Sequence, residues 1–86
     1  MNELSEDLKQ LLLLREAARL EWRVAFTEYY ETLLADGELE TRLEEAARSA
    51  MVHQRLLVKR GRDPFEAAEE AFLEWICLDG IPPRTR

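Results

Sequence analysis

Residues 11–26 read LLLLREAARLEWRVAF, and the placement of their apolar side chains decides the fold. At 100° per residue these side chains divide into two stripes on a helix. The broader stripe contains Leu14, Ala18 and Trp22. A thinner stripe lies on nearly the opposite side and consists of Leu13, Ala17, Leu20 and Val24. A helix that is apolar on two sides lies either in the middle of a bundle or between its own bundle and a partner.

This stretch belongs to a long predicted helix over residues 6–35. Ser5 is a suitable N-terminal cap, and Gly37 can adopt the left-handed conformation that ends a helix. Strong helix formers fill the interval, and neither Gly nor Pro interrupts it. About thirty residues at 1.5 Å per residue give a rod of roughly 45 Å. We therefore expect one long helical segment, and the sequence does not decide whether it is continuous or broken near residues 12–14.

Two further helices are predicted, over residues 38–60 and 64–79. Small side chains on the core face of the first of them favour a tight antiparallel hairpin with helix 6–35. The last helix has the clearest start in the sequence, with Asp63 as cap and Pro64 at the first helical position. The expected fold is thus all-α, a three-helix arrangement built on a long helical hairpin. Residues 1–80 form a single domain, and residues 81–86 form a flexible tail.

The two apolar stripes predict self-association. Two shorter helices could hardly cover both sides of such a long rod, so we expect a two-fold homodimer formed through the first helix, together with an unidentified protein partner. Aromatic side chains often anchor interfaces and are included in the predicted protein interface. That interface comprises Leu13, Ala17, Leu20, Val24, Trp22, Tyr29 and Tyr30.

The sequence offers little that could perform catalysis. Ser49 and His53 are four residues apart on one predicted helix, but no Gly-rich segment provides an oxyanion hole. Cys77 lies at the edge of its helix without a neighbour that would activate it. Ala50 precedes His53 by three positions, where a di-iron motif requires Glu. We therefore expect a non-enzymatic protein without cofactor or metal.

The formal net charge is −6, yet one block between residues 48 and 62 carries only cations. The simplest interpretation is that they pair with acids on neighbouring helices and favour the negative end of their own helix. A sharper one is contact with an anionic partner, whether an acidic protein patch or DNA. The residues concerned are Arg48, Arg55, Lys59, Arg60 and Arg62.

Two functions follow from these features. The first is a small helical interaction protein, such as an adaptor, assembly factor or inhibitor, that self-associates and offers a helical face to a protein partner. The alternative is a DNA-associated regulator, resembling an antitoxin or a plasmid or phage repressor, that uses the basic block. Its reading helix would carry four glutamates and no cation, which is the wrong sign for a DNA groove.

The expected location is the cytoplasm. The longest apolar run, residues 11–14, is far too short to cross a membrane, and a single cysteine is typical of a reducing compartment.

Overall fold

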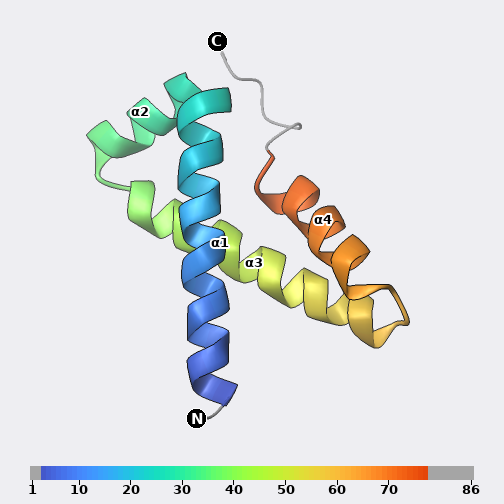
Figure 1. Ribbon diagram of the computed structural model, residues 1–86. Helices are drawn as coiled ribbons and strands as arrows, with labels where there is room; N and C mark the ends of the chain where they lie inside the picture. Colours follow the sequence, from blue (N-terminus) through green and yellow to red (C-terminus); the bar gives the residue numbers. More distant parts are fainter. Residues whose placement is uncertain (1–2, 78–86) are drawn as a thin grey trace.

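The computed structural model describes residues 3–77, with side chains from residue 6 onward. This part of the chain is entirely helical, without a strand, as the sequence predicts. It forms four helices rather than three: α1 (Glu3–Ala25), α2 (Thr27–Asp36), α3 (Leu39–Lys59) and α4 (Pro64–Trp75) (Figure 1). The predicted tail, residues 81–86, lies outside the described residues.

The predicted helix 6–35 is interrupted at Phe26, so this segment is two helices and not one rod. Phe26 has φ −131° and ψ 57°, which no helix accommodates. The hydroxyl of Thr27 donates a hydrogen bond of 2.9 Å to the carbonyl of Arg23, four residues earlier. Such bonds from Ser or Thr to the preceding turn bend helices. The bend turns α2 back toward α3, where Leu33 becomes buried.

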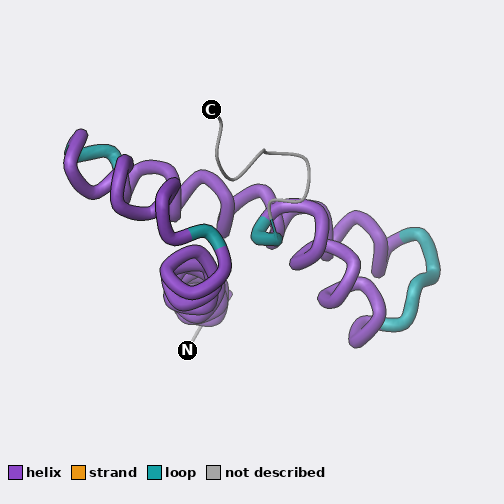
Figure 2. Tube along the Cα trace, turned by 90° about the horizontal axis from the view of Figure 1, so that it is seen from above, coloured by secondary structure: helices purple, strands orange, loops and turns teal. Residues whose placement is uncertain are grey.

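Helix α3 crosses α1 instead of running along it, so the predicted antiparallel hairpin of residues 6–35 and 38–60 is also wrong. Figure 2 looks down α1 and shows α3 lying across it. The reason is the order of the elements, because the turn at Gly37 joins α3 to the short α2 and not to α1. Gly37 itself adopts the left-handed conformation that was predicted, with φ 77°.

The core forms where α1, α2, α3 and the end of α4 meet. Its largest fully buried side chains are Trp22, Leu43 and Ile76. The indole Nε1 of Trp22 donates a hydrogen bond of 2.7 Å to the carbonyl of Ile76, and the Trp22 ring meets Tyr29 edge to face with centroids 5.4 Å apart. Trp22 thus joins three helical segments that are distant in the sequence.

Helix α4 begins as predicted but is shorter and turned differently. The carboxylate of Asp63 accepts the backbone N–H groups of Phe65 and Glu66, and Pro64 occupies the first turn. The helix ends at Trp75, before the predicted residue 79, since the Ile76 carbonyl turns to Trp22. Its buried residues are Ala67 and Ala71, whereas the large aromatic side chain of Phe65 is 78% exposed. Small side chains thus form the packed face, which brings α4 close to α3.

The assembled helices make a flat molecule. Its principal extents are 40 × 26 × 15 Å, and the shortest of them is little more than the width of one helix. Helices α1 and α4 pack on α3 and make no direct helix-to-helix packing with each other. Each helix therefore keeps a broad side in contact with solvent.

Candidate interaction surfaces

The first candidate surface is the α1 stripe, which we define as Leu13, Ala17, Leu20 and Val24. Ala18 and Trp22, on the other side of α1, are buried in the core. The stripe faces away from them, and Leu13, Leu20 and Val24 are 70%, 57% and 71% exposed, while Ala17 is half-buried. The chain thus leaves three large aliphatic side chains of one helix face in water, and the four stripe positions follow one another at intervals of four, three and four residues.

Two exposed charges border the stripe along one edge, Glu16 and Arg23. Glu16 accepts a hydrogen bond of 3.2 Å from Nε of Arg19. Arg23 makes no ion pair with any residue in the described part of the chain. Both side chains therefore lie in water at one edge of the stripe, and Glu16 is bonded to Arg19 through both of its carboxylate oxygens.

Arg19 makes its contacts within the chain, with Glu40 of α3 and Glu16 of α1. Its Nη1 and Nη2 donate to the two carboxylate oxygens of Glu40 at 2.8 and 3.0 Å, which ties α1 to the first turn of α3. This two-point contact lowers the pKa of Glu40 and raises that of Arg19. Arg19 thus links Glu16 of α1 to Glu40 of α3 and serves the junction between these two helices.

The predicted aromatic members of the interface lie elsewhere. Trp22 is only 2% exposed and belongs to the core, so its assignment to the interface is wrong. Tyr29 and Tyr30 are half-buried and pack against the same core. These residues were grouped by side-chain type, whereas their helical positions place Trp22 on the buried stripe.

The cations of the predicted basic block are largely paired with carboxylates. Arg48 donates to Glu44 at 2.6 Å within α3. Arg55 pairs with Asp7 of α1, and Arg62 pairs with Glu70 of α4. The last contact raises the pKa of Arg62. Among residues 3–77, Lys59 and Arg60 have no ion-pair partner. This arrangement matches the simplest interpretation, in which the block pairs with acids on its own and neighbouring helices.

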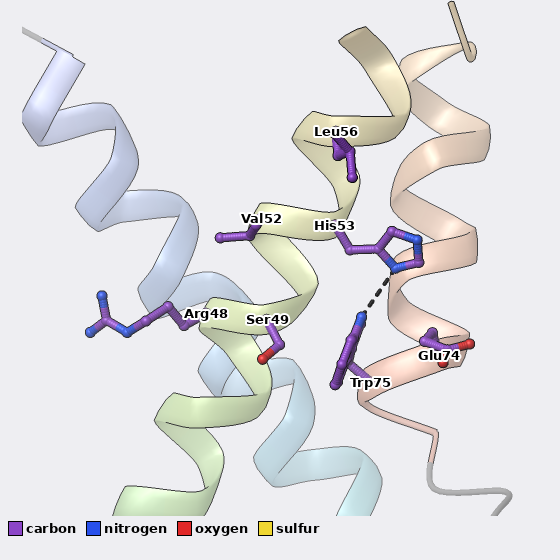
Figure 3. A pocket seen from close by; sticks show the side chains of 7 residues that line it. All are labelled: Arg48, Ser49, Val52, His53, Leu56, Glu74 and Trp75. Atoms are coloured by element: carbon purple, nitrogen blue, oxygen red, sulfur yellow. Dashed lines mark hydrogen bonds between the residues drawn. The ribbon is translucent and has the colours of Figure 1, made fainter. Parts of the chain in front are cut away.

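A second candidate surface is the α3–α4 groove, which was not predicted from the sequence. The groove encloses about 470 Å³ and is lined by Arg48, Ser49, Val52, His53, Leu56, Glu74 and Trp75 (Figure 3). Its apolar surface comes mainly from Val52, Leu56 and Trp75, all of them exposed. It lies on α3 and α4 and shares no residue with the α1 stripe.

His53 and Trp75 form the wall of this groove. The indole Nε1 of Trp75 donates a hydrogen bond of 3.1 Å to Nδ1 of His53, and the rings meet edge to face at 6.4 Å. His53 Nδ1 therefore acts as an acceptor, and the proton of a neutral ring lies on Nε2. Figure 3 shows Trp75, not Ser49, at the imidazole, so the sequence pair Ser49–His53 is not assembled as a nucleophile and base.

Cys77 is half-buried, and its Sγ lies 3.8 Å from a carboxylate oxygen of Glu21. A carboxylate repels a thiolate, whereas reactive cysteines lie beside cations or helix N-termini. The contact with Glu21 therefore does not activate the Cys77 thiol as a nucleophile.

Two further features are absent from the described residues. No group of three or more His, Cys, Asp or Glu side chains in this part of the chain could hold a metal ion. None of the helices in residues 3–77 combines the length and the apolar character needed to cross a bilayer.

Comparison with known proteins finds no relative of this chain. No protein-family model matches the chain, and neither the curated proteins nor the solved structures contain a match to it.

Proposed function

We propose that this chain is a small non-enzymatic interaction protein that self-associates through the α1 stripe and offers a second helical face to a protein partner. The observation that carries the proposal is the exposure of Leu13, Leu20 and Val24 on the side of α1 that faces away from the core. Removing apolar surface from water contributes roughly 25 cal/mol for each Å² that is buried. The stripe supplies such surface without requiring any change in the fold.

The spacing of the stripe supports contact with another helix. Side chains at successive intervals of four and three residues follow one line along a helix, and they can interlock with a similar line on a partner. The α3–α4 groove supplies the second face, because a lining that combines apolar side chains with the charged Arg48 and Glu74 suits an amphipathic helix.

The proposal is tested by comparing Leu20→Glu with Leu8→Glu. Both leucines are on α1 and both are 57% exposed, but Leu8 lies outside the stripe. We expect the wild type to show concentration-dependent dimerisation in sedimentation equilibrium. Leu20→Glu should abolish it, since two buried carboxylates would face apolar surface. Leu8→Glu should dimerise like the wild type, and both variants should keep the wild-type helicity in circular dichroism.

Two results would contradict the proposal. One is a wild type that stays monomeric up to millimolar concentration and captures no protein partner. The other is equal loss of association in Leu20→Glu and Leu8→Glu, which would show that added charge, and not the stripe, determines the effect.

A further inference from the structure

We infer that the partner on the α1 stripe is a second copy of the chain whose α1 runs antiparallel, with Glu16 of each copy facing Arg23 of the other. This inference rests on the proposed function and adds the orientation and the charge pairs that select it. It draws on three observations: the stripe's spacing, the charges at its edge and the break at Phe26.

The spacing assigns each stripe residue a place in a helix pair. Residues 13, 17, 20 and 24 alternate by four and three, which is the seam of a two-stranded coiled coil. A two-fold axis near the middle of the stripe places Leu13 opposite Val24 of the second copy and Ala17 opposite Leu20. The smallest side chain of the seam then meets a large one, so the two helices can approach evenly along the stripe.

The antiparallel orientation brings opposite charges together. Glu16 and Arg23 each directly precede a seam position, Ala17 and Val24, and both are exposed. Glu16 of one copy and Arg23 of the second copy lie on the same side of the two-fold axis. Their distances from that axis differ by two residues, which is about 3 Å along the helix. Symmetry repeats the pair, so one dimer gains two ion pairs.

The parallel orientation brings like charges together. In a parallel pair, the residue before one seam position faces the residue five places later on the partner helix. Glu16 would then face Glu21 of the second copy, and symmetry would repeat this repulsion. Arg23 would face Glu28, but that residue belongs to α2, beyond the break at Phe26, and does not continue the line of α1. The parallel pair therefore has two repulsions and no compensating attraction at this edge.

The substitution Glu16→Arg separates the two orientations because its effect has opposite signs. In the antiparallel pair it places the new guanidinium beside Arg23 of the second copy, and we expect the dimer Kd to rise about tenfold, since each exposed pair contributes modestly. In the parallel pair the new guanidinium would lie beside Glu21 and lower the Kd. Glu69→Arg is the control, because it makes the same charge change on an exposed position of α4.

The double variant Glu16→Arg/Arg23→Glu completes the test. In the antiparallel pair it exchanges the two charges and restores their attraction, so its Kd should return to within about twofold of the wild-type value. In the parallel pair the guanidinium at position 16 would stay beside Glu21, and the Kd would stay below the wild-type value. Sedimentation equilibrium at low salt measures all four proteins, and circular dichroism checks that loss of the contact between Glu16 and Arg19 leaves α1 helical.

The outcomes separate this inference from the proposed function. A tighter dimer in Glu16→Arg, a Kd no different from that of Glu69→Arg, or a double variant that fails to recover would overturn the antiparallel pairing. Each of these outcomes would leave self-association through the stripe intact, provided that Leu20→Glu still abolishes the dimer. A monomeric wild type would overturn this inference, and a monomeric wild type that also captures no protein partner would overturn the proposed function as well.

Discussion

The hydrogen bond from the Trp22 indole to the Ile76 carbonyl is buried and joins residues that are 54 positions apart. It fastens the end of α4 to the middle of the core, where no water can replace a missing donor. A buried carbonyl that loses its partner costs about 1–3 kcal/mol. This single side chain therefore contributes both apolar burial and a long-range polar contact.

Trp22→Phe should lower the free energy of unfolding by about 2–3 kcal/mol, because it removes that donor and part of the ring. The matched variant Trp75→Phe removes an indole that is 40% exposed and bonded to His53, so its cost should stay below about 1 kcal/mol. Urea denaturation of both variants measures the difference. Equal losses would mean that the bond to Ile76 contributes little.

Glu40 should give stability a pH dependence at low pH. Arg19 lowers the pKa of Glu40 in the folded chain below its ordinary value of 4.5. The contribution is therefore fully present above pH 4.5 and is lost as the pH falls through the lowered folded pKa. Glu40→Gln should cost no more than about 1 kcal/mol at pH 7, because the pair is exposed, and should cost less as the pH falls below 4.5.

Denaturation of wild type and Glu40→Gln at pH 7, 4 and 2 tests this dependence. The control is Glu31→Gln, since Glu31 is exposed and has no ion pair in the described chain. A difference between wild type and Glu40→Gln that stays constant with pH would contradict the ionic origin of the contribution.

At the scale of the elements, helix ends were predictable where local chemistry determines them. Asp63 with Pro64 defines the start of α4, and Gly37 ends α2 with a positive φ. Both signals act within a few residues, so sequence alone carries them. The pairs of Arg42 with Glu38 and of Arg48 with Glu44 were predictable for the same reason.

The break between α1 and α2 and the crossing of α1 by α3 were not predictable from local chemistry. No Gly or Pro marks Phe26, and the only local signal is the hydroxyl of Thr27. The bend is stabilised by the tertiary contacts that it allows, which are the burial of Leu33 and the contact of Tyr29 with Trp22. Those contacts belong to the tertiary structure, whereas Trp22 could have been assigned to the core from its place beside Ala18 on the broader stripe of α1.

The cap of α4 gives a prediction at this scale. Asp63 accepts two backbone N–H groups, at 3.0 and 3.2 Å. Asp63→Ala leaves both without that acceptor and should lower the free energy of unfolding by about 1 kcal/mol, whereas Asp63→Asn retains an acceptor and should cost less. Thermal denaturation followed by circular dichroism measures both. The prediction fails if Asn destabilises as much as Ala.

At the scale of the whole molecule, charge argues against DNA as the partner. The net charge is −6, and three of the five cations in the basic block already face carboxylates. Duplex DNA binding draws most of its nonspecific affinity from phosphate neutralisation. We expect no change in the anisotropy of a labelled duplex at about 50 mM salt and about 10 µM protein. Binding that weakens as salt rises, and that Lys59→Glu abolishes, would restore the DNA-associated regulator as the better hypothesis.

The separation of the α3–α4 groove from the α1 stripe has a consequence for valency. A two-fold dimer joined through α1 carries two identical grooves, one on each subunit, and neither is used up by dimerisation. A ligand that displays two copies of a matching helix would engage the second groove at an effective concentration in the millimolar range. Weak binding at each groove would then add up to strong avidity, and dilution below the dimer Kd would switch that avidity off.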